Sequence, residues 1–246
     1  MSSARTCVEG LTVQLGRTTA VRDASVRFGA GVTAVVGANG SGKSTLLRCM
    51  AGLVRPTSGT VQIAGRSLSS PDGRRGARTD LGYLSQRTDF PGSYTAREAL
   101  NYGAWLHRVP RDLRSQAVED ALHRYSLVNE RDAELRTLSG GTRQRVYIAL
   151  SSIHRPAVLL LDEPSVGLDL TQRHALREAI HRAGQEATVV VTTHDIDDLV
   201  DMADRLVVLA KGRLVFEGSI ADLHATNDRS LIEQRLRDLM AGEAAA

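Results

Sequence analysis

A glycine-rich stretch between two apolar runs constrains this chain more than any other feature. Val32 to Val36 form a short, mostly β-branched run that predicts a buried strand, and the residues after Thr45 predict a helix. Between them, glycines stand at positions 37, 40 and 42, and Lys43 and the hydroxyl residues Ser44 and Thr45 follow. This strand–loop–helix context is the one that a phosphate-binding loop requires. The alternative, a glycine-rich turn without a ligand, is disfavoured by the flanking strand and helix.

The residue types in this loop fit the phosphates of a nucleotide. Glycines allow successive backbone N–H groups to point into one concavity, and the start of the next helix adds further donors. Lys43 can reach the β- and γ-phosphates, and the Ser44 hydroxyl can ligate Mg²⁺. Lysine occurs only at positions 43 and 211, which makes a chance match to this pattern rarer. The motif predicts a nucleotide-phosphate site and leaves the enzyme class open.

Bulk composition excludes several classes of protein. The chain has 246 residues, of which 42% are hydrophobic and 24% charged, as is ordinary for a globular protein with a full core. A net charge of +3, without arginines interleaved with aromatic residues, argues against nucleic acid as a partner. Cys7 and Cys49 lack disulfide or metal-ligand spacing, and Cys49 is expected to pack in a core.

Targeting signals are also missing from the pattern. The first residues have no apolar segment typical of a signal peptide. No apolar run approaches the ~18 residues that a membrane span needs. We therefore expect a cytoplasmic chain unless a partner holds it at a membrane.

The N-terminal part predicts antiparallel strands. Apolar and polar residues alternate over Val8–Leu15 and Ala20–Phe28, which indicates two strands joined near Gly16. Residues 60–64 predict another short strand. The turn-rich segment from Ser69 to Thr79 is interpreted as an exposed loop whose arginines are solvated or meet the acidic surface of a partner.

The remainder of the chain changes pattern twice. From Thr95 to Leu127, apolar residues recur at helical spacing, with Val109-Pro110 separating two helices. Apolar strands at Val158–Leu161 and Thr188–Thr193 then alternate with helices, which predicts a parallel sheet covered on both faces. The other predicted elements are a strand at 81–85, helices at 142–153, 171–183 and 196–202, a hairpin at 205–216, and an amphipathic C-terminal helix packed on its own domain.

Two adjacent carboxylates follow the strand at 158–161. Asp162 and Glu163 are expected at the sheet edge where ligands bind, and the glycine-rich loop leaves its own strand at that same edge. Asp162 can hold the coordination shell of Mg²⁺, while Glu163 can orient an attacking water or accept its proton. The alternative is an acidic pair that caps a helix or turn before Pro164, and the phosphate-binding loop in the same chain makes it the weaker one.

A third pattern indicates the family. Leu138-Ser-Gly-Gly141 precedes a helix, where a serine and two glycines form a second anion site that is a weak signal by itself. Combined with the other motifs, it makes the chain resemble the nucleotide-binding domain of ATP-binding cassette (ABC) transporters over nearly its whole length. The motifs stand in the order typical of the family: Walker A at 37–45, a glutamine at 86, the signature at 138–141, Walker B at 158–163, the D-loop at 165–169, and Thr-His-Asp at 193–195.

The resemblance implies a role for each matching residue. Mg²⁺ would be contacted by Ser44 and Gln86, with Asp162 in its outer shell. Glu163 would be the catalytic carboxylate, and His194 would contact the γ-phosphate and help to align the water. The phosphates of ATP would be cradled by the Walker A residues Gly37, Ala38, Asn39, Gly40, Ser41, Gly42, Lys43, Ser44 and Thr45.

The resemblance also implies partners. Hydrolysis would need two such domains facing each other head to tail, as a homodimer or as a heterodimer with a related subunit. The helices over 95–127 would face a separately encoded integral membrane permease and so place the chain at the inner face of the cell membrane. The residues expected to contact the nucleotide held by the other copy are Ser139, Gly140, Gly141 and Asp169.

The fold class implied is α/β. It consists of a P-loop NTPase core with a mostly parallel sheet, an N-terminal antiparallel β subdomain and an inserted α-helical subdomain. We expect a single ABC ATPase domain over 1–246. Its parts are the antiparallel subdomain at about 1–31, the core at 32–86 and 155–217, the helical subdomain with the signature at 87–154, and a helical tail at 218–246.

The chain departs from the family pattern at Leu15. Family members usually stack the adenine on an aromatic residue in the first hairpin, and the aligned nucleotide-binding position here is Leu15. Leucine offers the base an apolar contact, but ring stacking adds about 1 kcal/mol beyond area burial. We therefore expect weaker base discrimination or a higher ATP requirement. Thr142 likewise stands where a glutamine is usual after the signature glycines.

The implied function is an ATPase subunit that drives a permease. The segments 83–86, 105–106 and 138–145 resemble those of bacterial drug, antibiotic or peptide exporters more than importers, so export is expected and an importer subunit is the alternative. A soluble ABC ATPase that acts in macromolecular assembly is another alternative, which pull-down of a membrane subunit would distinguish. A nucleotide-binding regulator without turnover is disfavoured by the presence of Glu163 and His194.

Overall fold

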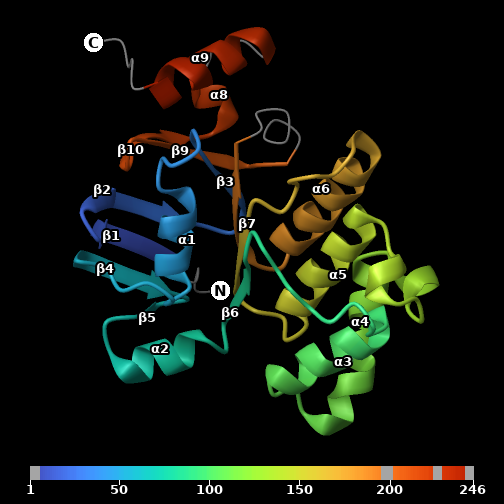
Figure 1. Ribbon diagram of the computed structural model, residues 1–246. Helices are drawn as coiled ribbons and strands as arrows, with labels where there is room; N and C mark the ends of the chain where they lie inside the picture. Colours follow the sequence, from blue (N-terminus) through green and yellow to red (C-terminus); the bar gives the residue numbers. More distant parts are fainter. Residues whose placement is uncertain (1–5, 195–201, 224–228, 242–246) are drawn as a thin grey trace.

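The computed structural model describes residues 6–194, 202–223 and 229–241, which build two β-sheets (Figure 1). The first sheet is four-stranded and antiparallel, in the order β2-β1-β4-β5. Its first two strands form the predicted hairpin around Gly16, a residue with φ of +60°. The strands of this sheet are β1 (Thr6–Leu15), β2 (Thr18–Phe28), β4 (Ser58–Ile63) and β5 (Arg66–Ser67).

The second sheet is mostly parallel, as predicted. Its six strands lie in the order β10-β9-β3-β8-β7-β6, and only β10 runs antiparallel to its neighbour. The strands at its centre are mostly apolar because both faces of the sheet are covered, and polar residues such as Asp162 and Thr192 stand at their carboxyl ends. The six strands of this sheet are β3 (Gly31–Val36), β6 (Leu81–Leu84), β7 (Val158–Asp162), β8 (Thr188–Thr193), β9 (Arg205–Ala210) and β10 (Arg213–Gly218).

The two faces of the parallel sheet contribute to different cores. Side chains alternate along a strand, so Leu160 of β7 enters one core and Leu161 enters the other. The core around Leu160 lies between the two sheets and includes helix α1 (Lys43–Met50). Cys49 is buried there, which confirms its predicted packing role. The core around Leu161 lies beneath the helices on the opposite side, as Figure 1 shows.

Helices cover that opposite side. Helices α3 (Ala96–Leu106) and α4 (Arg114–Arg124) confirm the predicted helical segment and its break near Val109-Pro110. Helix α3 begins with a capping box, in which Thr95 and Glu98 bond each other's backbone N–H groups. The layer is completed by α5 (Gly140–Ser152) and α6 (Leu170–Gly184). Helix α5 starts two residues earlier than predicted, so the signature glycines form its first turn.

One segment differs from its prediction. The stretch 69–79, expected to be an exposed loop, contains helix α2 (Pro71–Ala77). Ser70 caps it by accepting a hydrogen bond from the N–H of Gly73, and Pro71 occupies the first helical position. Ser and Pro at these positions are start signals for a helix. The glycines at 73 and 76 lower intrinsic helix propensity and make the same segment resemble a loop.

The C-terminal helices pack on the chain itself. Helices α8 (Ile220–Leu223) and α9 (Arg229–Ala241) pack at the end of the parallel sheet that is formed by β9 and β10 (Figure 1). Ile232, Leu236 and Leu239 are buried in the core that also contains β9, which confirms the predicted packing of the tail. The predicted helix over 196–202 lies, except for its last residue, outside the described residues. Among the helices that the structure describes, none is both long and apolar enough to cross a bilayer.

Candidate functional site

Strand order brings the sequence motifs to one edge of the parallel sheet. Strand β8 lies between β3, which precedes the glycine-rich loop, and β7, which precedes the two carboxylates. Val36 is in register with Thr193, and Asp162 is in register with Thr192. The three strands therefore end at nearly the same level. The loop at 37–42, the Asp162–Glu163 pair and the residue after β8 all emerge at this edge.

The loop at 37–42 has a backbone that only glycine adopts easily. Gly40 and Gly42 have φ angles of +78° and +108°. A Cβ atom on Gly42 would lie 2.3 Å from the carbonyl oxygen of Ala20, so a side chain is excluded there by space as well as by φ. Gly42 is the N-cap of α1 and provides no side-chain cap. Within the part of the chain that the structure describes, the first turn of α1 therefore has no side-chain cap, an arrangement that suits an anion.

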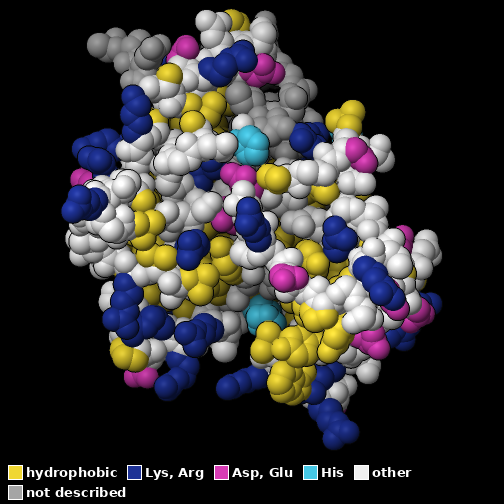
Figure 2. Space-filling view, viewed as in Figure 1, with side chains coloured by type: hydrophobic (Ala, Val, Ile, Leu, Met, Phe, Trp, Pro, Cys, Tyr) yellow, Lys and Arg dark blue, Asp and Glu magenta, His cyan; other side chains and the backbone are white. Residues whose placement is uncertain are grey.

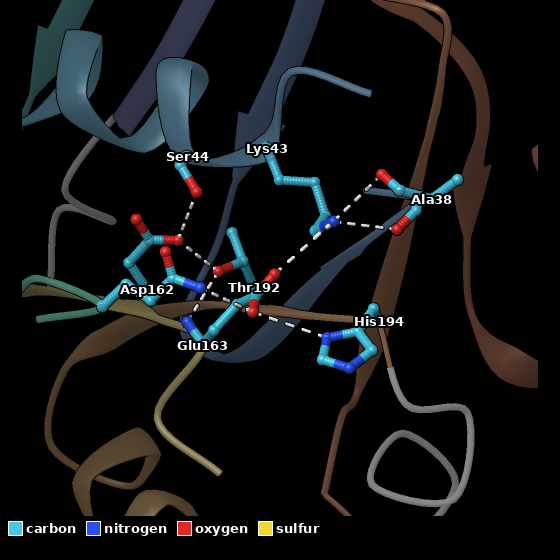
Figure 3. A network of polar contacts seen from close by, with 9 residues as sticks. Ala38, Lys43, Ser44, Asp162, Glu163, Thr192 and His194 are labelled. Atoms are coloured by element: carbon cyan, nitrogen blue, oxygen red, sulfur yellow. Dashed lines mark hydrogen bonds and ion pairs between the residues drawn. The ribbon is translucent and has the colours of Figure 1, made fainter. Parts of the chain in front are cut away.

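Lys43 is a buried cation at the centre of the site. It is 4% exposed, and its Nζ donates to the carbonyl oxygens of Gly37 at 2.8 Å and Ala38 at 3.2 Å (Figure 3). The same Nζ lies 3.7 Å from Oε1 of Glu163. Burial lowers the pKa of Lys43, and the nearby Glu163 carboxylate opposes that shift. Additional negative charge beside the ammonium group would therefore stabilise its charged form.

Asp162 joins three segments of the chain. Its Oδ1 accepts hydrogen bonds from the Ser44 hydroxyl at 2.9 Å and from the Thr192 hydroxyl at 2.7 Å. Ser44 belongs to the first turn of α1, and Thr192 belongs to β8. Asp162 is almost completely buried, so its orientation is determined by these bonds. Figure 3 shows the Ser44 and Asp162 side chains pointing toward one another.

Glu163 is held in an unusual conformation. Its φ angle is +48°, a left-handed value that costs a non-glycine residue of order 1–3 kcal/mol. Its backbone N–H donates to Thr192 Oγ1 at 2.8 Å. Its Oε2 accepts a hydrogen bond from Gln86 Nε2 at 3.0 Å and lies 3.5 Å from Nδ1 of His194. Glu163 is 9% exposed, so polar groups surround a carboxylate that water barely reaches.

The structure thus brings most of the predicted site residues together. The network in Figure 3 links Lys43, Ser44, Asp162, Glu163 and His194. Gln86 belongs to it as well, and two residues of the Walker A loop, Gly37 and Ala38, accept hydrogen bonds from the Lys43 ammonium. Ser41 of the same loop is also a predicted phosphate-binding residue. Its hydroxyl oxygen is buried and has no hydrogen-bond partner in the described part of the chain.

Other predicted site residues lie apart from this network. Leu15 is at the end of β1 and is 45% exposed. Ser139 caps α5 by accepting a bond from Thr142 N–H at 3.2 Å, and Asp169 caps α6 by accepting one from Gln172 N–H at 2.8 Å. Within the described residues, no hydrogen bond or ion pair joins positions 139–141 or 169 to the Walker A loop. A single chain therefore leaves these two groups of residues unconnected.

Two residues of the site escaped sequence analysis. Thr192 links the neighbouring carboxylates, but in the run Thr188–Thr193 it resembles an ordinary strand residue. Its place at the end of β8, two residues before His194, is the signal that points to it. Gln172 accepts a hydrogen bond from the Gly141 N–H at 3.2 Å. That contact joins two helices and has no signature in the sequence.

Comparison with known proteins places this arrangement in a family. The family model for the ABC transporter matches residues 21–166. The methionine import ATP-binding protein MetN of Geobacillus kaustophilus is 31% identical over 233 residues, which cover 93% of this chain and 68% of MetN. The sulfate/thiosulfate import ATP-binding protein CysA of Mycobacterium bovis is 38% identical over 196 residues, which cover 78% of this chain and 55% of CysA.

A solved structure is similar to this chain over nearly its whole length and agrees with the family match. The structure of cbiO1 from Clostridium perfringens, described as part of the ABC transporter complex cbiONQ, is similar with a TM-score of 0.83 and 27% identity. The similarity covers 98% of this chain and 97% of that chain, so it extends over both sheets and the helical layer. The predicted fold class is confirmed. With a family model that matches more than half of its residues, the chain belongs to the ABC transporter family and is one of its ATP-binding domains, which are ATPases.

Proposed function

We propose that this chain binds MgATP at the edge of the parallel sheet, hydrolyses it through Glu163, and drives a membrane permease together with a second ATPase copy. The observation that supports this most strongly is the setting of Glu163. Its two carboxylate oxygens are shared among Lys43, Gln86 and His194, which lie on three different segments. Such an arrangement orients one carboxylate toward a reacting atom, as a general base requires.

The residues at this edge of the sheet fit a nucleoside triphosphate. The buried Lys43 ammonium faces the loop, and the first-turn N–H groups of α1 have no side-chain cap. Both features favour phosphate oxygens at this position. We assign phosphate binding to the Walker A residues and an apolar contact with the base to Leu15, whose exposed side chain is available for it.

The oxygen donors beside the loop fit Mg²⁺. This ion takes few protein ligands and completes its shell with water and phosphate oxygens. The Ser44 hydroxyl and the Asp162 carboxylate, 2.9 Å apart, offer that type of ligand next to the phosphate position. Gln86 is the third proposed metal contact. When bound, Mg²⁺ neutralises charge that develops on the phosphate oxygens, while Glu163 and His194 orient the attacking water.

We propose that the second group of site residues serves the nucleotide of another copy. Ser139, Gly140 and Gly141 form the N-terminal turn of a helix, a place where an anion is stabilised, yet this turn is not connected to the chain's own Walker A loop. A head-to-tail dimer places the turn and Asp169 against the partner's ATP. Homodimers and heterodimers with a related subunit both satisfy this geometry.

The surface of α3 supports a permease as a further partner. Figure 2 shows hydrophobic side chains gathered where α3 lies in Figure 1. Exposed residues there include Trp105 at 56% and Leu106 at 53%, and Tyr102 packs against Trp105 with ring centroids 5.7 Å apart. Exposed aromatic groups of this kind mark protein interfaces. CbiO1 is described as part of a complex, which agrees with an assembly of several chains.

Import replaces export as the proposed direction. Export, expected from the resemblance of three short segments, is not supported by the relatives described above. MetN and CysA are both named as import ATP-binding proteins, and they match this chain over most of its length. A neighbouring gene for a solute-binding protein, together with ATP-dependent uptake by the permease complex, would support import. ATP-dependent accumulation of substrate inside inverted vesicles, without a binding protein, would contradict it, because the outer face of such vesicles is the cytoplasmic face.

The decisive test of the ATPase assignment is Glu163→Gln. This change keeps the side-chain shape and removes the proton acceptor, so we expect ATP hydrolysis to fall by about 10² to 10⁴-fold with ATP binding retained. Hydrolysis at the wild-type rate would overturn the assignment of Glu163. Copurification of an integral membrane protein would support the transport role, whereas recovery with a soluble macromolecular complex alone would favour the assembly alternative.

A further inference from the structure

The signature turn of α5 is bonded to the neighbouring helix α6. The N–H of Gly141 donates to Gln172 Oε1 at 3.2 Å. A Cβ atom on Gly141 would lie 2.6 Å from Gln172 Cβ, so the Gln172 side chain rests directly against the backbone of the turn. The N–H groups in the first turn of a helix have no acceptor within the helix. Gln172 therefore supplies an acceptor that an anion would otherwise supply.

Two further hydrogen bonds cap the helices on either side of this contact. Ser139 Oγ accepts from the Thr142 N–H and lies 3.0 Å from Thr142 Oγ1. The N–H of Gln172 donates to Asp169 Oδ1 at 2.8 Å. Gln172 thus touches the signature turn with its side chain and the D-loop aspartate with its backbone. One residue connects the two segments that we propose to meet the partner's nucleotide.

We propose that Gln172 acts as an internal latch on the signature turn, competing with the γ-phosphate of the ATP held by the second copy for the Gly141 N–H. This inference rests on the proposed head-to-tail dimer. One N–H group donates strongly to one acceptor, so the phosphate must displace Gln172 Oε1 when the dimer closes. The latch stabilises the separated chain and raises the ATP concentration needed for dimerisation. Gln172 is a positioning residue, because it acts on ATP through Gly141.

Two substitutions of Gln172 distinguish a latch from a merely structural contact. Gln172→Leu removes the competing acceptor at similar side-chain size, which leaves the Gly141 N–H unpaired until the phosphate arrives. Dimerisation should then need about fivefold less ATP per site, the factor expected for one neutral hydrogen bond. Gln172→Glu keeps an acceptor but places a negative charge beside the incoming phosphate. Dimerisation of this variant should therefore need at least about fivefold more ATP. A structural contact predicts weaker dimerisation for both variants.

The experiment measures dimerisation directly. Each variant is made in the Glu163→Gln background, where ATP persists, and the ATP concentration at half-maximal dimer formation is determined by sedimentation velocity. Gln185→Leu and Gln185→Glu are matched controls, because Gln185 is exposed at the opposite end of α6 and should leave the midpoint unchanged. In the hydrolysing background, Gln172→Leu should lower KM with little change in kcat.

The outcomes separate this inference from the function on which it rests. Opposite shifts for Gln172→Leu and Gln172→Glu, with silent controls, establish the latch. Shifts in the same direction, or none, overturn it while leaving the dimer model intact. If the Glu163→Gln parent binds ATP and stays monomeric at every ATP concentration, the proposed dimer of this chain is wrong and the latch is wrong with it.

Discussion

Thr192 donates its hydroxyl proton to Asp162 Oδ1 at 2.7 Å, across the pair of strands β8 and β7. The same hydroxyl oxygen accepts the N–H of Glu163 at 2.8 Å. A single buried oxygen therefore aligns the proposed metal-binding carboxylate and the proposed catalytic carboxylate at once. This dual role explains how two adjacent acidic residues are kept in different orientations at the end of one strand.

The first prediction concerns that hydroxyl. Thr192→Val keeps the shape of the side chain and leaves the Glu163 N–H without its acceptor, so the free energy of unfolding should fall by about 1–3 kcal/mol. Misplacing Glu163 by about 1 Å should lower kcat by about 10²-fold. Urea unfolding and steady-state ATP hydrolysis measure the two effects. Thr192→Ser, which restores the hydroxyl, should recover most of the activity, and equal loss in both variants would contradict the model.

A second prediction follows from the left-handed backbone at Glu163. Glycine occupies φ of +48° without the Cβ penalty, whereas alanine bears a cost of about 1–2 kcal/mol. Glu163→Gly should therefore be more stable to urea than Glu163→Ala by about 1 kcal/mol, although both lose the carboxylate. Each variant leaves Lys43 without the same partner, so the difference between them isolates the backbone term. Greater stability of the alanine variant would show that the strain is absent.

The third prediction concerns the adenine position. Leu15→Tyr introduces a ring at the exposed end of β1, where stacking on the base should improve ATP affinity by about 1 kcal/mol. Equilibrium binding of ATP to the Glu163→Gln form measures the change. Leu15→Ile is the matched control, because it keeps an aliphatic side chain of the same size. If tyrosine leaves the affinity unchanged, Leu15 is not the base-contacting residue.

The fourth prediction is a pH dependence of folding stability. His154 and His107 stack with ring centroids 3.9 Å apart, and His154 also bonds the carbonyl oxygen of Leu81 at 3.2 Å. Burial, with a smaller contribution from His107, lowers the pKa of His154 from 6.5 to about 4. The unfolded chain thus binds more protons than the folded chain between these values. The stabilisation is complete above pH 6.5 and is lost as the pH falls toward 4.

Urea unfolding at pH 7.5 and at pH 5.5 tests this dependence. Burial also lowers the pKa of His107, so both rings act in the same direction. His154→Gln should reduce the loss of stability between the two pH values, while the variant is somewhat less stable at pH 7.5. An identical loss in wild type and variant would assign the pH effect to other groups.

Much of the fold and the site was predictable because the motifs are local. The first strand of the parallel sheet, the glycine-rich loop and the helix after it all lie between Gly31 and Met50, and parallel strands necessarily share their carboxyl edge. The sequence pattern alone therefore assigns Asp162, Glu163 and His194 to one edge of the sheet. The order of the strands was not predictable, so the position of β8 between β3 and β7 remained hidden, and with it the role of Thr192.

Contacts between segments distant in sequence account for the rest. Gln172 and Gly141 meet because α5 and α6 pack side by side, and no periodicity encodes that pair. Helix α2 escaped prediction for a different reason: two glycines masked the start signal provided by Ser70 and Pro71. The local signals for α2 conflict with each other, whereas the contact between Gln172 and Gly141 has no local signal.

The alternation of side chains along β7 determines what lies on either side of the acidic pair at its end. Leu160 packs against the half of the molecule that contains α1, and Leu161 packs against the half that contains α5 and α6. Both faces of β7 are therefore covered by packed side chains. The strand ends at Asp162, and Glu163 is the next residue. The acidic pair therefore adjoins both halves of the molecule, the one that binds the nucleotide loop and the one built from helices.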